Sequence, residues 1–359
     1  MYKNSISILV ACLIFFTACA SSAEEKGDSG ETVTVSQQSL EETLSEPEAE
    51  ITGELVIYSG RSESLVSEVI AGFEAETGVQ VNVRYAKSTA LSGTLVLEGA
   101  ISPADVFFSQ DPVSLGIVAK EGLFDVLPDE LLDNVPTWAV DLKGYWVGTS
   151  GRSRSLVVDT RDVADEELPS DVYGLNNEKF RGRLGLAPGN SSFVAMVACM
   201  IETDGEEKVA EWLTAINGLG YTEYPKNSPQ VAAAAAGELD IGMVNHYYTL
   251  RTLAETGDTP IKNVYLKSGC GAMVMPAGAG VLSSSQNKPA AIAFIEYLHS
   301  TSAQEAFTNT VFEFPLVAGI TPHPLLPEIG SLNSPENLNW SALAIWQEKA
   351  VELIAQAGF

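Results

Sequence analysis

The sequence predicts an α/β fold, because strands and helices alternate along the 359 residues of the chain. Apolar runs at 54–58, 79–84 and 104–108 have the length and composition of strands, and each precedes a segment with helical character. The links between these segments are short, which favours a mainly parallel sheet. The length suggests two domains and is sufficient for a sizeable core.

The first helix has clear signals at both ends. Ser62 is a suitable N-cap, and Glu63 lies in the first turn, where the helix dipole favours an acid. Apolar residues then recur at helical spacing as far as Gly78, which ends the helix. Further helices are expected over 89–99 and from Pro112.

The alternation continues to the C-terminus. The long apolar stretch 145–158, which contains Arg152 and Arg154, predicts a strand that crosses between two lobes. The other expected strands are 184–188, 240–244, 263–267 and 280–282. One further helix is expected after the turn 189–192, and others over 206–216, 231–237, 248–255, 289–299 and 341–357. A turn over 225–228 is expected before the helix 231–237.

The N-terminal segment predicts export. Residues 1–19 contain an early lysine and a short apolar run, which is typical of a secretory signal peptide. The run ends in a sequence that resembles a lipobox, so we expect Cys19 to be a lipid anchor; cleavage near 20–23 is the alternative. Residues 20–50 are acidic and poor in large apolar side chains, and predict a disordered tether.

The net charge of −27 argues against nucleic acid and anionic lipid as partners. Beyond the N-terminal run, no stretch is apolar enough to span a bilayer. Two cysteines, Cys199 and Cys270, remain in the body of the chain. Export permits a disulfide between them, and two separate buried thiols are the alternative.

Two adjacent phenols stand at a predicted strand-to-helix switch. Tyr247 and Tyr248 follow the apolar run 240–244 and begin a segment with helical character that Gly257 ends. Proteins of the α/β class bind ligands at such switches. Phenolate is a hard anionic oxygen donor, and a trivalent cation can displace its proton at neutral pH. The pair suggests an iron(III) site; the alternative is one ring in the core and one on the surface.

Several short motifs recur in a fixed order from about residue 54 to the C-terminus: Tyr58–Glu63, Ser102–Ser109, Ser150–Arg154, Lys226–Ser228, Asn245–Tyr248, Ser284–Asn287 and Glu313–Leu316. Together they resemble the periplasmic ferric-ion-binding proteins of bacterial iron ABC transporters. The resemblance implies a two-lobed, type II, transferrin-lobe-like fold with the ligand in the cleft between lobes. It implies lobe 1 over 51–154, lobe 2 over 155–278, and a return to lobe 1 over 279–359, whose C-terminal helices could pack on lobe 2.

The resemblance places the family's metal-binding tyrosine pair at Tyr247 and Tyr248. The family's histidine falls on Ser62 and its carboxylate on Gln110, and neither residue is a good iron(III) ligand. Some members bind iron largely through tyrosines together with a chelating anion, and this sequence is closer to them. It departs from their pattern where a third tyrosine is replaced by Val157 or Val158.

The anion site of the family matches a set of polar residues: Asn190, Ser191, Ser192, Asn227 and Asn245. A serine-rich helix N-terminus offers N–H donors to an oxyanion. Arg152 can clamp a carbonate in bidentate fashion, and Arg154 is the substitute candidate. Further candidates at or near the metal are Tyr58, which could supply a third phenol, Ser62, Gln110, and Arg251, which could orient a phenolate.

The resemblance implies a monomeric, exported protein, in the periplasm or on the outer face of the cytoplasmic membrane. It would capture Fe(3+) with carbonate or phosphate and deliver it to an ABC permease and its ATPase. The alternative is a binding protein for an oxyanion, a phosphonate or another small solute. A secreted hydrolase is disfavoured, because the chain lacks a Gly-x-Ser-x-Gly elbow and zinc-spaced histidines.

Overall fold

The computed structural model describes residues 51–335 and 338–359, which belong to one compact unit. The signal peptide predicted over 1–19, its Cys19 and the tether over 20–50 lie outside the described residues. Within the described part of the chain, no helix is long and apolar enough to cross a membrane.

The core of the unit is a sheet of nine strands in the order β2-β1-β3-β9-β4-β7-β5-β6, with β8 also paired to β4. The strands are β1 Glu54–Ser59, β2 Gln80–Tyr85, β3 Val106–Ser109, β4 Val147–Asp159, β5 Leu184–Leu186, β6 Tyr221–Glu223, β7 Ile241–Asn245, β8 Ile261–Val264 and β9 Val274–Val281. The pairings among β1 to β3 and among β5 to β7 are parallel, whereas every pairing of β4 or β9 is antiparallel. The expectation of a mainly parallel sheet was therefore wrong for its centre.

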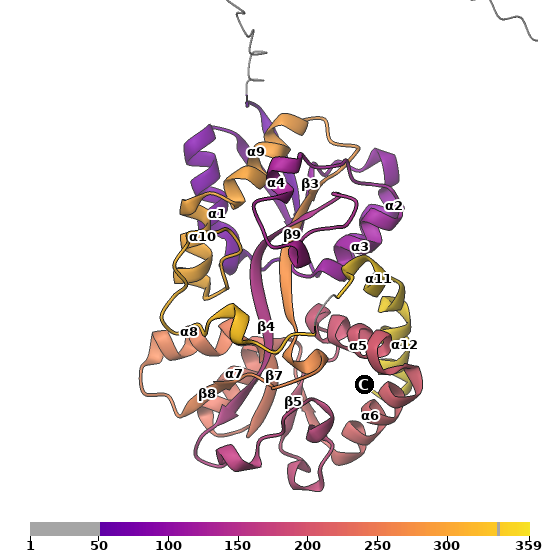
Figure 1. Ribbon diagram of the computed structural model, residues 1–359, viewed down its shortest axis with the longest axis vertical. Coiled ribbons are helices and arrows are strands. Elements are labelled where there is room, and N and C mark those ends of the chain that lie inside the picture. The colour runs from indigo at the N-terminus through magenta and orange to yellow at the C-terminus, as the bar shows by residue number, and fades with distance from the viewer. Residues whose placement is uncertain (1–50, 336–337) are drawn as a thin grey trace, which may run out of the picture. The chain divides into compact units, whose positions relative to one another are not determined.

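Strands β4 and β9 run through the middle of the unit and connect its two parallel halves (Figure 1). All 13 residues of β4 are buried, which confirms the long strand predicted there. Strand β9 is much longer than predicted and contains glycines that the backbone at or next to β4 approaches closely. A Cβ at Gly278 would lie 2.8 Å from the carbonyl oxygen of Val147, and one at Gly280 would lie 2.7 Å from that of Tyr145. Only glycine lets the two backbones come this close.

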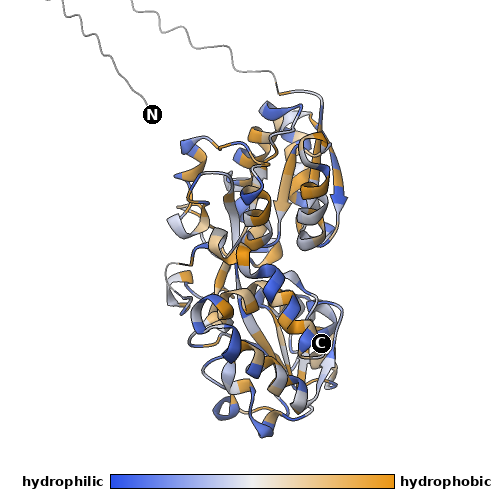
Figure 2. Cartoon of the chain, turned by 90° about the vertical axis from the view of Figure 1, so that its right-hand side faces the viewer, coloured by the Kyte–Doolittle hydropathy of each residue, from blue (hydrophilic) through white to orange (hydrophobic). Residues whose placement is uncertain are grey.

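Helices cover both halves of the sheet (Figure 1). They are α1 Glu63–Thr77, α2 Ser88–Glu98, α3 Pro112–Lys120, α4 Asp129–Leu132, α5 Ser191–Asp204, α6 Glu206–Leu219, α7 Asn227–Ala236, α8 His246–Thr256, α9 Lys288–Leu298, α10 Thr301–Ala306, α11 Trp340–Leu343 and α12 Gln347–Gln356. Figure 2 shows hydrophobic residues concentrated on the strands and hydrophilic residues on outward-facing parts of the helices. This is the pattern expected of amphipathic helices packed on a buried sheet.

Two predicted boundaries need correction. Helix α7 begins at Asn227, so the second half of the turn expected over 225–228 belongs to the first turn of the helix. The single helix expected over 341–357 is interrupted by a 3₁₀ turn at Ala344–Trp346, between α11 and α12. The residue limits of the two lobes stay a prediction.

A disulfide joins Cys199 in α5 to Cys270, which lies in the short 3₁₀ helix that precedes β9. It closes a sequence separation of 71 residues. Of the two alternatives that the sequence left open, the structure has the paired form, which is typical of exported proteins.

Candidate functional site

Tyr247 and Tyr248 lie in the first turn of α8, directly after β7. Asn245 ends the buried strand in an extended conformation and the helix begins at the next residue, so the predicted strand-to-helix switch is confirmed. The ring of Tyr247 is 0% exposed, whereas that of Tyr248 is partly exposed. Their ring centroids are 4.4 Å apart. Their exposure agrees with the alternative of one ring in the core and one at the surface, but the two tilted rings also lie in contact, which leaves both phenols in one place.

A hydrogen-bond network surrounds the phenol oxygen of Tyr247. The amide Nδ2 of Asn245 donates to this oxygen across 3.3 Å and to Ser192 Oγ across 3.2 Å. The Oδ1 atom of Asn245 accepts from Arg154 Nη1 at 2.9 Å. An N–H donor stabilises negative charge on the oxygen that it contacts. The network therefore holds Tyr247 in a surrounding that suits an anionic oxygen.

The N-terminus of α5 contributes the predicted anion-binding turn. Asn190 is its N-cap, and its Oδ1 accepts from the backbone N–H of Ser192 at 3.0 Å. Ser191 and Ser192 are both buried. Ser192 Oγ accepts hydrogen bonds from Asn245 and, at 3.4 Å, from Gln110 Nε2. Its own hydroxyl proton is thus available to another acceptor.

Arg152 is the most unusual side chain of the site. It lies on β4, is 0% exposed, and none of its Nε, Nη1 and Nη2 atoms has a hydrogen-bond partner among the described residues. Burial lowers the pKa of Arg152, and electrostatic attraction by Tyr247 and Glu313 opposes that effect. A buried guanidinium with unsatisfied donors is costly unless an anion accompanies it. Its donor set fits a planar oxyanion.

A second buried arginine close by is already compensated. Arg61 Nη2 lies 2.8 Å from Glu313 Oε1, with both side chains fully buried. Arg61 also donates to Ser150 Oγ at 3.2 Å, and that hydroxyl donates to the other carboxylate oxygen of Glu313 at 2.5 Å. We did not predict this pair as part of the site, although both residues lie in motifs that carry the family resemblance. It leaves Arg152 as the buried arginine whose three nitrogens have no hydrogen-bond partner among the described residues.

The remaining candidates lie in different places. The Tyr58 hydroxyl donates to Glu98 at 3.1 Å and accepts from Arg84, so its oxygen is already engaged by α2 and β2. Asn227 is buried, and its amide has no partner among the described residues. Ser62 and Arg251 line a pocket next to Tyr248.

Two histidines have structural roles. His246 is fully buried, and its Nε2 lies 2.8 Å from the carbonyl oxygen of Phe312. Burial lowers the pKa of His246 to about 4, which keeps the ring neutral. His299 is also buried, with Nε2 2.8 Å from the carbonyl oxygen of Gly148.

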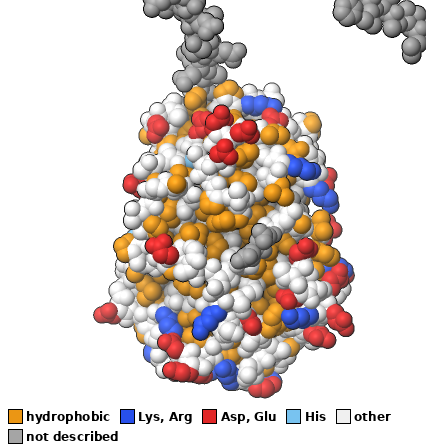
Figure 3. Space-filling model, viewed as in Figure 1, with side chains coloured by type: hydrophobic (Ala, Val, Ile, Leu, Met, Phe, Trp, Pro, Cys, Tyr) orange, Lys and Arg blue, Asp and Glu red, His pale blue; other side chains and the backbone are white. Residues whose placement is uncertain are grey.

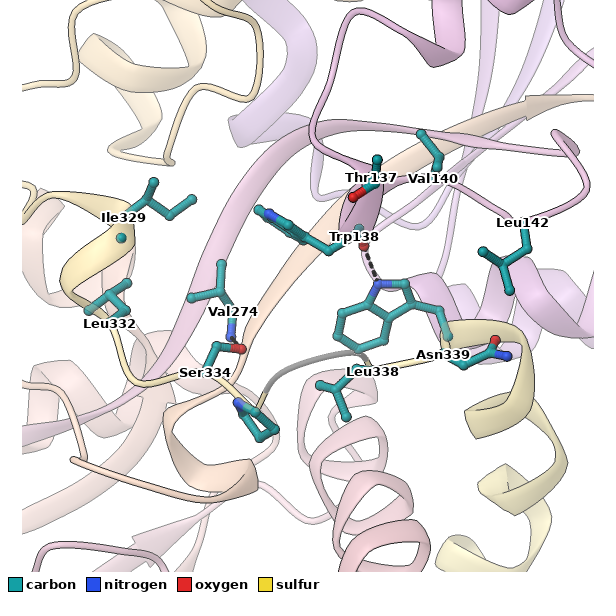
Figure 4. A pocket seen from close by; sticks show the side chains of 13 residues that line it. Thr137, Trp138, Val140, Leu142, Val274, Ile329, Leu332, Ser334, Leu338 and Asn339 are labelled. Atoms are coloured by element: carbon teal, nitrogen blue, oxygen red, sulfur yellow. Dashed lines mark hydrogen bonds between the residues drawn. The ribbon is translucent and has the colours of Figure 1, made fainter.

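Two pockets differ in chemistry. The pocket at Tyr248 has a volume of about 290 Å³ and a polar, charged lining. A larger one, of about 590 Å³, is lined mainly by apolar side chains, among them Trp138, Val274 and Trp340 (Figure 4). Hydrophobic side chains also gather in the middle of the face in Figure 3. The larger pocket contains none of the predicted site residues, so we place the functional site at the tyrosines.

The described residues contain no group of three or more His, Cys, Asp or Glu side chains arranged to hold a metal ion. A hard cation at this site would depend on the two phenol oxygens and on added oxygen ligands. The geometry offers a phenol pair at the start of α8, with a buried guanidinium and a serine-rich helix N-terminus nearby.

A polar cluster placed between the parallel halves of a curled, mixed sheet is the arrangement of a two-lobed solute-binding protein. The model of the family described as bacterial extracellular solute-binding protein matches residues 102–344, and the chain belongs to this family. The family consists of binding proteins, in agreement with the expectation that the chain is not an enzyme. Because the family is extracellular, membership also supports the predicted export.

Similar proteins and solved structures belong to the same class, the periplasmic binding proteins for iron. An Fe(3+)-binding periplasmic protein of Serratia marcescens is 33% identical over 308 residues, which cover 85% of this chain and 90% of the relative. The structure of iron-bound HitA from Pseudomonas aeruginosa has a TM-score of 0.81 and 28% identity, and covers 85% and 99% of the two chains. Trichodesmium IdiA (FutA), in complex with iron and citrate ligands, has a TM-score of 0.69 and 26% identity, with 85% and 99% covered. These similarities confirm the family resemblance and the two-lobed fold class.

Proposed function

We propose that this protein captures ferric iron outside the cytoplasm, together with a small oxyanion, and delivers it to an ABC permease and its ATPase. The observation that carries the proposal is the contacting pair Tyr247 and Tyr248, placed near the guanidinium of Arg152, whose donors have no partner among the described residues. The names of the relatives, which describe ferric-iron-binding proteins, support the same cargo.

Charge and coordination explain why an anion is needed. Two phenolates neutralise only part of the charge of iron(III) and leave coordination positions open. Ser62 and Gln110 supply no anionic oxygen in place of the histidine and carboxylate of the family. A carbonate or phosphate held by Arg152 and the turn Asn190–Ser192 would fill the open positions and neutralise the buried guanidinium.

The capture mechanism that we propose is lobe closure. Lys87 Nζ, which follows β2, donates to the carbonyl oxygen of Gly189 at 3.3 Å, and Gln110, after β3, reaches Ser192. Both contacts connect the β1–β3 half of the sheet to the turn before α5. A ligand that touches both halves stabilises the form in which these contacts exist.

Metal analysis and colour test the cargo. Protein purified without chelators should contain iron and show a visible tyrosinate-to-iron charge-transfer band. A receptor for a free oxyanion or phosphonate, the alternative function, would be colourless and would bind phosphate equally well without iron. Iron-free, colourless protein that takes up phosphate would support that alternative.

The anion is tested by titrating iron from a weak chelator into apo-protein. Affinity should rise when bicarbonate or phosphate is returned to a buffer stripped of both, and Arg152→Ala should weaken this dependence. Arg181→Ala, which removes an arginine from the exposed Arg181–Glu178 pair, is the control. Equal affinity in both buffers would mean that the protein completes the coordination shell itself.

We further propose that the protein is a monomer tethered to the membrane through Cys19. Cys19→Ser should move it from the membrane fraction to the soluble fraction of the cell envelope. If the variant stays with the membrane, ordinary cleavage with another mode of attachment replaces the lipid anchor.

A further inference from the structure

His246 is the first residue of α8 and connects three segments of the chain. The backbone N–H of Ser153 in β4 donates to its Nδ1 across 3.0 Å, and its Nε2 lies 2.8 Å from the carbonyl oxygen of Phe312. A neutral imidazole carries a proton on one nitrogen only. Because Nδ1 accepts, Nε2 carries the proton and donates to Phe312. Both nitrogens are therefore engaged by the backbone of the protein itself.

The ring of His246 also contacts the tyrosine pair. It stacks on Phe314, with centroids 4.8 Å apart and an interplanar angle of 30°. It meets the ring of Tyr247 edge-on, with centroids 5.6 Å apart and an angle of 83°. His246 and Tyr247 are both fully buried. A ring that is fixed by two hydrogen bonds and a stacking contact thus limits the positions open to the neighbouring phenol.

Phe312 has an unusual backbone conformation. Among the described residues it is the only one other than glycine with a positive φ, at φ 62° and ψ 36°. It directly follows the π-helical turn Phe307–Val311, a rare conformation that is frequent at functional sites. A glycine would end such a turn at lower cost, because the left-handed region is disfavoured for residues with a Cβ atom. The surroundings that hold Phe312 in this form also fix the carbonyl oxygen that His246 contacts.

The segment that follows the π-helical turn is also attached to β4. Phe314 exchanges two backbone hydrogen bonds with Gly151, of 2.7 Å and 2.8 Å. Gly151 and Ser153 lie on either side of Arg152 in the strand, and the second of them is bound by His246. One segment, 312–314, is thus bonded both to β4 next to Arg152 and to the first residue of α8.

We infer that His246 is a positioning residue for the tyrosine pair, and that its hydrogen bond to the left-handed Phe312 fixes the first turn of α8 in the geometry that holds the metal. The inference rests on the proposed function, because it takes the tyrosines as the ligands. The bond to Phe312 carries the effect. Strand pairing of Asn245 with Arg154 already attaches the preceding residue to β4, and the bond from Ser153 only extends that attachment.

Two substitutions separate the two hydrogen bonds of His246. A glutamine can place its amide nitrogen near the position of Nε2 and keep the bond to Phe312. An asparagine is one bond shorter, and can place its amide oxygen near the position of Nδ1 and keep only the bond from Ser153. The variants are therefore His246→Gln and His246→Asn.

His299→Gln and His299→Asn are the matched controls. His299 is a second buried histidine whose Nε2 lies 2.8 Å from a carbonyl oxygen of β4, that of Gly148. Among the described residues, its ring is not one of those in contact with Tyr247. These controls remove a similar buried hydrogen bond, so they reproduce a loss of stability without a change at the tyrosines.

Each full-length protein is loaded with iron in bicarbonate buffer, and release to a chelator is followed through the visible band. Thermal unfolding of the apo-proteins is measured in parallel. We expect His246→Asn to release iron about tenfold faster and to shift the absorption maximum, and His246→Gln to stay within about threefold of wild type. Both His299 variants should release iron at the wild-type rate, even where they unfold at a lower temperature.

The opposite results would overturn the inference. They are a wild-type release rate and spectrum in His246→Asn, equal acceleration in His246→Asn and His246→Gln, or equal acceleration in His299→Asn. Wild type that takes up no iron and shows no band would instead overturn the proposed function.

Variants of Phe312 test the same bond from its other end, and keep the inference testable if the changes at His246 prevent folding. Phe312→Gly and Phe312→Ala lose the same ring, but only glycine adopts the left-handed conformation without a steric cost. We expect the alanine variant to release iron at least about threefold faster than the glycine variant. Equal release rates in the two variants would overturn the role given to Phe312.

Discussion

Asn245 Nδ2 donates to the phenol oxygen of Tyr247 across 3.3 Å, and the guanidinium of Arg154 fixes the direction of that bond. An arginine can only donate, so its 2.9 Å contact requires the amide oxygen of Asn245 to face Arg154. The amide nitrogen must then face Tyr247 and Ser192. One side chain thus orients donors toward a phenol oxygen and toward the helix N-terminus at the same time.

Asn245→Asp should weaken iron binding without unfolding the protein. The new carboxylate would pair with Arg154, which keeps that buried cation satisfied, but it would present an acceptor to Tyr247 in place of a donor. We expect a loss of roughly tenfold or more in iron affinity, measured by titrating the visible band. Thermal unfolding serves as the control for folding. An unchanged or higher affinity would contradict the role given to this amide.

Iron binding should weaken in acid. Burial raises the pKa of Tyr248 well above its ordinary value, so the group holds its proton at neutral pH and must release it to coordinate iron. Affinity should therefore fall as pH falls, by roughly tenfold per pH unit for each proton released. Iron titrations at several pH values measure the affinity, and proton release followed in weakly buffered solution gives the number of protons released per iron bound. A pH-independent affinity would mean that Tyr248 is not deprotonated on binding.

Ser62→Ala and Gln110→Ala should barely change iron retention. Neither side chain offers an anionic donor, and the contact of Gln110 with Ser192 is long, at 3.4 Å. Competition with a chelator measures retention, and circular dichroism confirms the fold. A large loss for either variant would reveal a direct or water-mediated contact with the metal.

Removal of the disulfide should cost stability and leave the iron site intact. In the chain-entropy view, the bridge between Cys199 and Cys270, 71 residues apart, contributes about 4 kcal/mol to the free energy of unfolding. Urea denaturation of the double variant Cys199→Ala, Cys270→Ala should show this loss, and reduced wild type should behave like the variant. Equal stability of the oxidised and reduced proteins would contradict it.

The sequence was sufficient for the elements that position the tyrosines. The apolar run 240–244 and the stop at Gly257 predicted β7 and α8, because a buried strand and a glycine-terminated helix have local signals. Strand β9 was largely missed, because its small residues have low strand propensity. They are required by the approach of β4, which is a tertiary contact that no local pattern reveals.

For the proposed site, the sequence indicates candidate residues but not the contacts between them. The tyrosine pair, the serine turn and Arg152 stand out by residue type. Which buried arginine lacks hydrogen-bond partners among the described residues depends on long-range pairing: Glu313 lies 252 residues from Arg61 along the chain and neutralises it. The same holds for the pocket at Tyr248, since three separate helices form it.

Iron titration of Tyr247→Phe and Tyr248→Phe, read by the visible charge-transfer band and by metal analysis, tests the central claim most directly. Each substitution removes one oxygen and almost no packing volume, so the fold should be kept. Tyr297→Phe, in the cluster with Phe73 away from the site, is the matched control. We predict that each site variant loses the band or most of it and retains much less iron, while the control resembles wild type. Full colour and full iron content in both site variants would contradict the assignment of the tyrosine pair as the iron ligands.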